Sequence, residues 1–263
     1  MRHLLPVIAI VAVAVATLPA RAQTFAAMVS PPRFELEAKP GETVRAVFEL
    51  NNRADTSSEY LLRTADWTLS RDFNVLFADE LAPGSCRPWV ALERPAVLLP
   101  AGGTIRYRFE VAIPADAPAG DCRFAILIEG KEASIAKAGA VSMPMTGRIG
   151  LIVYVNVGGA SANLELLRTR VVKVGERDLP TLVMHNAGAA HGRVAGFLTG
   201  TDANGVNYDF NPSDFPILPG TEADVYLTPS TSTNDHPVLS FPVRVQGTIE
   251  WGQHKLKIDE QFR

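Results

Sequence analysis

The sequence predicts an all-β protein built from two β-sandwich domains. Three observations predict this fold class. Short runs rich in Val, Ile, Phe, Leu and Tyr recur along the chain, and clusters of Pro, Gly, Asn and Asp interrupt them about every ten residues. No stretch after the amino-terminal segment shows a long 3.6-residue apolar period. The missing helical period argues against a parallel α/β sheet and against the crevice sites of dinucleotide enzymes.

The amino-terminal residues have the pattern of an export signal. An apolar run from Leu4 to Leu18 is followed by Ala20-Arg21-Ala22, the small-x-small pattern that a signal peptidase requires. A membrane anchor is the alternative, but Pro6 interrupts the run, which is short of the about 20 apolar residues that span a bilayer. We therefore predict a cleaved signal peptide over residues 1–22, a periplasmic location, and no membrane insertion after cleavage.

The charge of the exported chain is mildly acidic. The full sequence has 25 Lys and Arg against 28 Asp and Glu, and loss of Arg2 and Arg21 with the signal peptide leaves 23 against 28, a net charge of -5. This balance provides no basic surface for a nucleic acid or an anionic membrane.

The two cysteines, Cys86 and Cys122, both lie in the exported part, where a thiol pair persists as a disulfide. A bridge between them closes a loop of 37 residues and stabilises the fold by about 4 kcal/mol in the chain-entropy model. A redox role is disfavoured because no Cys-x-x-Cys occurs, and two cysteines without a nearby His make a poor zinc site.

The first domain is predicted over residues 23–157. Residues 33–37 and 43–50 alternate apolar and polar side chains around a Pro40-Gly41 turn, which predicts two paired strands. Arg148–Val157 is nearly continuous in apolar residues, as in a strand covered on both faces. The strands predicted between these are residues 60–67, 96–99, 104–111 and 122–129. Seven strands at this spacing fit an immunoglobulin-like sandwich.

The second domain is predicted over residues 158–263. Gly158-Gly159 marks a break, after which the strand pattern starts again, and Asn204-Gly205 predicts a hairpin turn. The strands predicted here are residues 162–166, 168–173, 180–186, 194–200, 206–210, 223–227, 243–251 and 256–258. Each half is long enough to bury a core of its own.

No motif for catalysis or metal binding stands out. The histidines lack metal-ligand spacing, and the polar stretch 202–214 does not match an EF-hand loop, so a hairpin with a polar loop is the better interpretation. Neither Gly-x-Ser-x-Gly nor Gly-x-x-x-x-Gly-Lys occurs. We predict a protein that is not an enzyme and that needs no metal and no cofactor, with a hydrolase hidden on a β-sandwich as the least favoured hypothesis.

The first domain resembles that of periplasmic pilus-assembly chaperones, whose two immunoglobulin-like domains form a boomerang. The residues that carry the resemblance are Ser30-Pro-Pro-Arg-Phe-Glu-Leu36, the Pro-Gly turn leading to 47–52, Trp67, 107–111 and 148–157. In that family an Arg on the first strand and a Lys on the last strand hold the terminal carboxylate of an unfinished pilin. The resemblance implies this role for Arg33, whereas Gly150 stands at the position of the Lys and Arg148 is the nearest basic residue.

The resemblance also implies a strand that completes the partner's sheet. Val141, Met143 and Met145 share one strand face and can fill the partner's groove by β-augmentation, although Pro144 removes one backbone donor. The alternative is a loop or edge that packs on its own core. The apolar residues Ile149, Leu151, Val153 and Val155 are expected in the core instead of at a binding surface.

Two functions follow as hypotheses. The first is a periplasmic chaperone-like protein that binds incomplete pilin-type subunits by strand addition during pilus assembly, with an outer-membrane usher as a further candidate partner. The second is an exported structural or adhesive binding module of the cell envelope, because Asn186-Ala-Gly-Ala-Ala-His191 and Leu218-Pro-Gly220 resemble elements of two-domain surface proteins.

Overall fold

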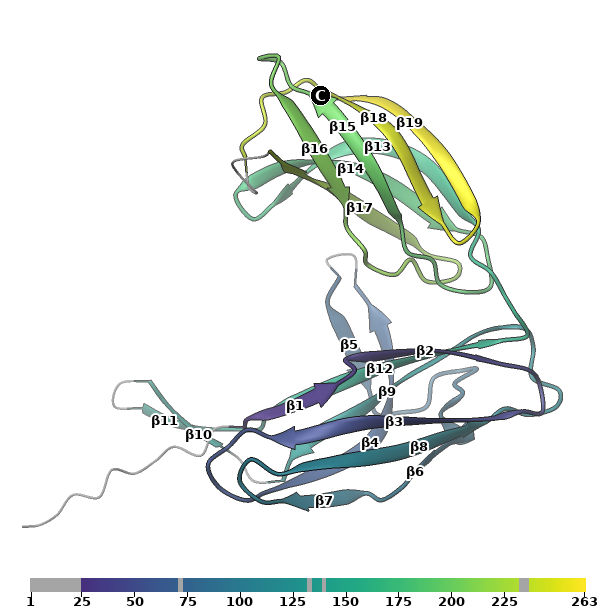
Figure 1. Cartoon of the computed structure of the whole chain (residues 1–263), viewed down its shortest axis with the longest axis vertical. Coiled ribbons are helices and arrows are strands. Elements are labelled where there is room, and N and C mark those ends of the chain that lie inside the picture. Colours follow the sequence, from purple (N-terminus) through teal and green to yellow (C-terminus); the bar gives the residue numbers. More distant parts are fainter. Residues whose placement is uncertain (1–24, 71–72, 132–133, 139–140, 232–236) are drawn as a thin grey trace, which may run out of the picture.

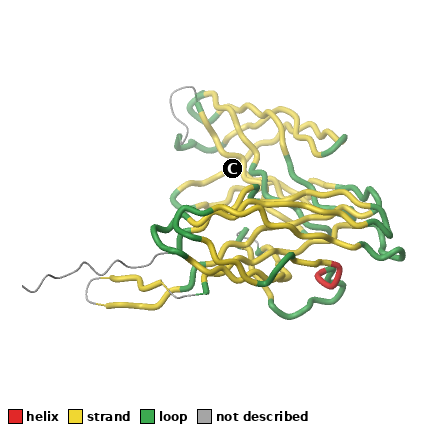
Figure 2. The backbone as a smooth tube through the Cα atoms, turned by 60° about the horizontal axis from the view of Figure 1, so that its bottom comes forward, coloured by secondary structure: helices red, strands yellow, loops and turns green. Residues whose placement is uncertain are grey.

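The computed structural model describes residues 25–70, 73–131, 134–138, 141–231 and 237–263. These residues form two all-β domains of immunoglobulin-like sandwich type, one stacked over the other and joined at one side (Figure 1). A single helical turn, the 3-10 helix Arg87–Trp89, interrupts the strands in this part of the chain (Figure 2). None of the described helices could cross a membrane. The signal peptide expected over residues 1–22 lies outside the described residues.

The first domain is a sandwich of two sheets. One sheet has the order β1-β3-β8-β6 and the other the order β2-β12-β9-β4-β5, with β7 also paired to β4. The first sheet consists of β1 (Ala27–Ser30), β3 (Thr43–Asn52), β8 (Thr104–Ala112) and β6 (Val90–Leu92). The second consists of β2 (Arg33–Ala38), β12 (Arg148–Val157), β9 (Gly120–Gly130), β4 (Ser58–Leu69), β5 (Val75–Ala78) and β7 (Ala96–Leu99).

The pairing expected between residues 33–37 and 43–50 is wrong. Strand β2 pairs in parallel with β12, whereas β3 pairs with β1 and β8 in the opposite sheet. The turn between them is a corner that carries the chain across the core from one sheet to the other. The backbone N–H of Gly41, which has a φ of 82°, bonds to the carbonyl of Ile113 and not to a residue of β3. Two strands with inward apolar faces can pack against each other across a core as well as side by side, and the alternation alone does not distinguish these arrangements.

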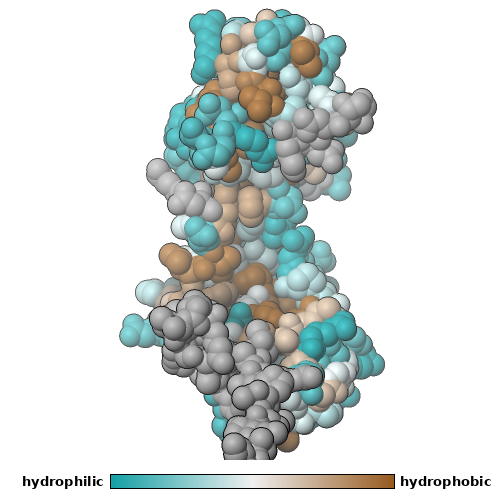
Figure 3. Space-filling model, turned by 90° about the vertical axis from the view of Figure 1, so that its left-hand side faces the viewer, coloured by the Kyte–Doolittle hydropathy of each residue, from teal (hydrophilic) through white to brown (hydrophobic). Residues whose placement is uncertain are grey.

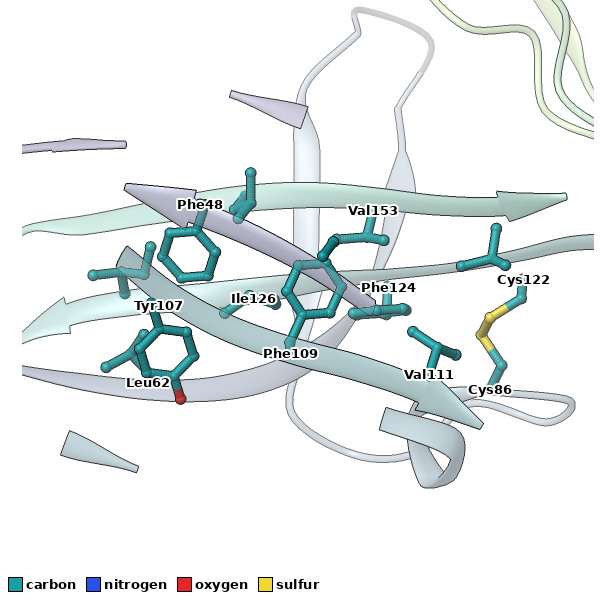
Figure 4. Close-up of a cluster of buried hydrophobic side chains, with 14 of the residues drawn as sticks. Phe48, Leu62, Cys86, Tyr107, Phe109, Val111, Cys122, Phe124, Ile126 and Val153 are labelled. Atoms are coloured by element: carbon teal, nitrogen blue, oxygen red, sulfur yellow. A yellow bond between two sulfur atoms is a disulfide. The ribbon is translucent and has the colours of Figure 1, made fainter. Parts of the chain in front are cut away.

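Aromatic rings fill the space between the two sheets (Figure 4). Phe109 contacts Phe34 edge-to-face with ring centroids 5.3 Å apart and contacts Phe124 in the same way at 6.3 Å. Leu151, Val153 and Val155 are fully buried in this core, as expected, whereas Ile149 is only half-buried and does not belong to the core cluster. At one end the predicted disulfide between Cys86 and Cys122 is present and ties β9 to the loop before the 3-10 helix.

The second domain follows one path of seven strands, β13-β14-β17-β16-β15-β18-β19. Strand β17 pairs with β14 through its first half and with β16 through its second half, so it links the two layers of the sandwich. The strands are β13 (Leu164–Val174), β14 (Arg177–Asn186), β15 (Ala195–Thr201), β16 (Asn207–Pro212), β17 (Glu222–Ser230), β18 (Val243–Trp251) and β19 (His254–Phe262).

Two local predictions for this domain have different outcomes. Residues 162–166 and 168–173 are not separate strands, since β13 runs through both with an irregularity between Leu166 and Arg168. The hairpin at Asn204-Gly205 is confirmed, because β15 and β16 pair across it. The Asp202 carboxylate holds this turn by accepting the backbone N–H groups of Asn204 and Val206 at 2.9 and 3.0 Å.

A further hairpin extends the first domain. Strands β10 (Ser134–Ala138) and β11 (Val141–Met145) pair antiparallel with each other, and in Figure 1 they project beyond the end of the sandwich. Because β9 leads into β10 and β11 leads into β12, the two pairs form one long ribbon in chain order.

Candidate functional site

One edge of the long ribbon is open. Strand β12 pairs with β9 along its whole length, but it pairs with β2 only from Ile152 onward. Arg148–Leu151 therefore have no strand partner on that side among the described residues, and β11 pairs only with β10 there. Residues 141–151 thus form an edge of about 36 Å at a rise of about 3.3 Å per residue, interrupted only between β11 and β12.

The residues expected to complete a partner's sheet lie on this edge. Val141, Met143 and Met145 stand opposite Ala138, Ala136 and Ser134 in the ladder. Alternate residues of a strand share one face, so the backbone places these three on a common face of β11. Their side-chain contacts lie outside the described part of the structure.

The two arginines expected near the partner are not brought together. Arg33 pairs with Ile152 in the parallel ladder, and Arg148 lies four residues earlier on β12, about 13 Å away along the strand. The Arg148 guanidinium lies 2.5 Å from Glu129, which also binds Arg63 at 3.0 Å. Arg148 therefore belongs to an ion-pair network on the outer face of the sheet.

The position that Gly150 occupies has no room for a side chain. A Cβ built at Gly150 would lie 2.2 Å from Cζ of Phe77, whose ring reaches over the outer face of the sheet from β5. A lysine at this position would have to displace that ring. The aromatic side chain thus gives a physical reason for the glycine in the last strand of the domain.

Arg33 is already paired with a carboxylate of its own chain. Its Nε lies 2.9 Å from Oε1 of Glu35, and the same oxygen lies 3.5 Å from Nε of Arg193, which belongs to the second domain. This contact uses one of the five N–H donors of the guanidinium, so a terminal carboxylate from a partner would approach the two Nη groups beside the negative charge of Glu35.

A buried carboxylate joins the two domains. Oδ2 of Asp121, at the start of β9, accepts hydrogen bonds from the His191 backbone N–H at 2.5 Å and from His191 Nδ1 at 2.8 Å. The His191 ring also stacks on Tyr154 of β12 with ring centroids 3.9 Å apart. Burial at this junction raises the pKa of Tyr154 to about 12. These contacts fix the second domain against the outer face of the first.

Aromatic contacts add a second connection. Phe73, in the turn between β4 and β5, stacks on Phe215 of the second domain at 4.1 Å and contacts Tyr226 edge-on at 5.6 Å. Leu218 packs into the apolar cluster that contains Trp67. Figure 3 shows hydrophobic surface at the waist of the molecule, where the domains meet. The domain orientation therefore depends on packing as well as on the linker.

Between the domains lies a cleft of about 490 Å³. Strands β2 and β12 form one wall, and the segment around His191 and the β18–β19 turn form the other. The cleft is lined by Glu35, Leu36, Glu37, Asp121, Tyr154, Asn156, Ala160, Ser161, Ala162, Ala190, His191, Gly192, Arg193, Trp251, Gly252, Gln253 and His254. Arg33 is beside this cleft through Glu35, whereas Arg148 is not part of its lining.

Sequence reasoning missed Asp121, Tyr154 and Arg193. Each lies in an ordinary strand or loop, and their relation depends on how one domain rests on the other. Only His191 was singled out, as part of Asn186-Ala-Gly-Ala-Ala-His191, and without a role at the junction.

No family model matches the sequence, and no curated protein matches it. Among solved structures the chain is similar to the class 5 fimbriae chaperone CfaA, at 10% identity over 89% of this chain and 98% of that one, with a TM-score of 0.47. It is also similar to the CupB2 chaperone of Pseudomonas aeruginosa, at 9% identity over 90% and 100% of the two chains, TM-score 0.47. A third is the SafB chaperone in complex with the Salmonella enterica SafA pilin, at 13% identity over 91% and 99%, TM-score 0.47. At these identities the likeness is one of fold.

Proposed function

We propose that this protein is a periplasmic, chaperone-like protein that holds incomplete β-sandwich subunits of pilin type by strand addition. The observation that carries the proposal is the edge of residues 141–151, which has no strand partner on its outer side in the described part of the chain. Natural proteins normally cover or blunt such an edge, because it pairs readily with other chains. An edge about 36 Å long that stays open is suited to binding an extended or incomplete sheet.

The chemistry of such binding needs no cofactor and no covalent step. Main-chain hydrogen bonds along the edge supply affinity, and alternate side chains select the partner. The partner's own folding supplies the driving force for release, and the held subunit then passes to an outer-membrane usher. Carboxylate capture by Arg33 is not part of the proposal, because Glu35 lies 2.9 Å from the Arg33 Nε and its negative charge opposes a second carboxylate.

The test removes the edge and keeps the sandwich. Lys131 and Thr146 flank the hairpin, and the backbone N–H of Gly130 already bonds to the Gly147 carbonyl, so an Asn-Gly turn can replace residues 132–145. The probe is a pilin-type subunit without its completing strand, and binding is measured by co-purification and refolding yield. We expect the shortened chain to keep its disulfide and thermal unfolding but to lose binding at least tenfold.

A matched pair of variants separates edge recognition from general loss of the hairpin. Substitution of Val141, Met143 and Met145 by Ser changes the strand whose outer side is open, and substitution of residues 134, 136 and 138 by Thr changes the strand opposite. We expect only the first set to weaken binding. Unchanged binding by both the first set and the shortened chain refutes strand addition and favours the structural or adhesive module.

A further inference from the structure

The interdomain cleft carries an excess of acidic groups. Its lining contains three carboxylates, from Glu35, Glu37 and Asp121, and one guanidinium, from Arg193. Arg33 and Arg193 both form ion pairs with Glu35. Glu37 has no ion-pair partner within the described part of the chain. An anionic ligand would therefore meet net repulsion in this cleft, whereas a cation would be attracted.

The same cleft contains buried polar atoms without partners. Asp121 has 1% of its side chain exposed, and its Oδ1 has no hydrogen-bond partner among the described residues, although Oδ2 has two. Oδ1 of Asn156 is a second unpartnered acceptor. The unpartnered donors are Nε1 of Trp251, a residue with 8% exposure, and Nε of Arg193, whose charge is balanced by Glu35 at 3.5 Å. Folded proteins leave few buried polar groups unsatisfied, because each one costs about 1–3 kcal/mol.

A second polar groove of the molecule pairs its polar groups, unlike the cleft. A groove of about 540 Å³ on the second domain is also polar, and it is lined in part by Thr201, Asn207 and Arg244. There Arg244 forms a two-pronged ion pair with Asp259 at 2.9 and 3.0 Å, and Thr201 bonds to Asn207 at 2.7 Å. The groove satisfies these polar groups internally, whereas the cleft presents two acceptors and two donors without partners among the described residues.

We propose that the cleft receives a Lys or Arg side chain of the bound polypeptide. The cationic group would donate to Asp121 Oδ1 and Asn156 Oδ1, with Glu37 supplying further negative charge. Trp251 Nε1 would donate to a main-chain carbonyl of the same segment. This inference rests on the proposed function for the identity of the ligand as a polypeptide, and it replaces the terminal carboxylate with a basic side chain as the group held between the domains.

The test uses small probes on the full chain. N-acetyl-arginine amide is titrated by NMR, alongside its neutral counterpart N-acetyl-citrulline amide and the anionic N-acetyl-glutamate amide. We expect the arginine probe to bind at least tenfold more tightly than the citrulline probe and the glutamate probe not to bind. Equal or tighter binding of the glutamate probe overturns the proposal.

Variants at Glu37 test whether the arginine probe binds in the cleft. Glu37→Gln is expected to weaken arginine binding about threefold, the size of an exposed charge pair, and Glu37→Lys to abolish it. The matched controls are Glu176→Gln and Glu176→Lys in the exposed turn between β13 and β14, which lies outside the cleft lining. Equal effects at the two positions also overturn the proposal, since they indicate attraction by net charge alone.

The shortened chain without residues 132–145 separates this proposal from the strand-addition proposal. It lacks the edge but keeps the cleft, whose lining does not include the hairpin. We expect it to bind the arginine probe as well as the intact chain does. Loss of subunit binding with retained arginine binding supports both proposals, whereas retained subunit binding refutes only the first.

Discussion

The ionisation of Tyr154 provides a direct measure of the contact between the domains. Its side chain is 2% exposed, and one reason is that the His191 ring of the second domain covers it at 3.9 Å. Desolvation by burial is the largest cause of its raised pKa, and the nearby guanidinium of Arg193 partly opposes the shift. Replacement of Tyr154 by Phe keeps the ring and removes the group that ionises.

The magnitude follows from the shift of the pKa from 10.0 to about 12. Below pH 10 the phenol is protonated in both the folded and the unfolded chain, and it contributes no pH dependence. Between pH 10 and pH 12 the unfolded chain loses this proton while the folded chain keeps it, so stability falls as the pH rises. Two pKa units correspond to a limit of about 2.7 kcal/mol, of which about 2.3 kcal/mol is reached at pH 12, where the folded chain is half ionised.

The assay is urea unfolding of both proteins at several pH values from 8 to 12. We expect the intact protein to lose about 2.3 kcal/mol more stability over this range than Tyr154→Phe does. Tyr60 and Tyr107 also have raised pKa values through burial, but they contribute equally to both proteins. If both proteins lose the same unfolding free energy over this pH range, the second domain does not cover Tyr154 in solution. The interdomain cleft would then not form as described.

Three further predictions concern individual contacts. Denatured, unreduced protein should show no free thiol by titration, and replacing Cys86 and Cys122 by Ser should cost about 4 kcal/mol of unfolding free energy, whereas two free thiols refute the bridge. Asp202→Ala should cost about 3 kcal/mol of unfolding free energy by removing the acceptor that holds its hairpin. Desolvation raises the pKa of Asp202, but hydrogen bonds to its carboxylate lower it more, so the stabilisation by this carboxylate should be lost as the pH falls through the lowered pKa. An acid unfolding curve that is the same with and without Asp202 contradicts this. Phe73→Ala should loosen the domains without unfolding either one, seen as a larger radius of gyration in small-angle scattering; an unchanged radius contradicts the stacking on Phe215.

Much of the fold follows from local sequence patterns. The β12 boundaries agree with the apolar run Arg148–Val157, and the hairpin after β15 follows from Asn204-Gly205. The alternation of 33–37 and 43–50 identified strands, but it could not determine which sheet each one joins. Among the short strands, the apolar run of β7 was predicted, whereas β5 and β6 were missed, since three or four residues contain little periodicity.

The contacts of the candidate site could be predicted from the sequence only in small part. Arg33 was found by resemblance, but its partner Glu35 sits two residues away on the same strand face, and nothing local shows that Arg193 approaches the same oxygen. Oδ2 of Asp121 is bonded to His191 of the second domain, a contact that the strand pattern around Asp121 does not predict. Charges and burial that depend on two domains meeting are tertiary properties, and a strand pattern contains no information about them.

The length of the open edge has a simple origin in the sequence. Strand β2 begins at Arg33, directly after Pro31-Pro32, and β1 before them pairs with β3 in the other sheet. Proline has no backbone N–H and cannot donate to a ladder, so β2 cannot extend backward along β12 past Ile152. Within the described residues, Arg148–Leu151 have no strand partner on this side for this reason. The two prolines between β1 and β2 thus limit how much of β12 is paired with β2 and how much is available to a partner.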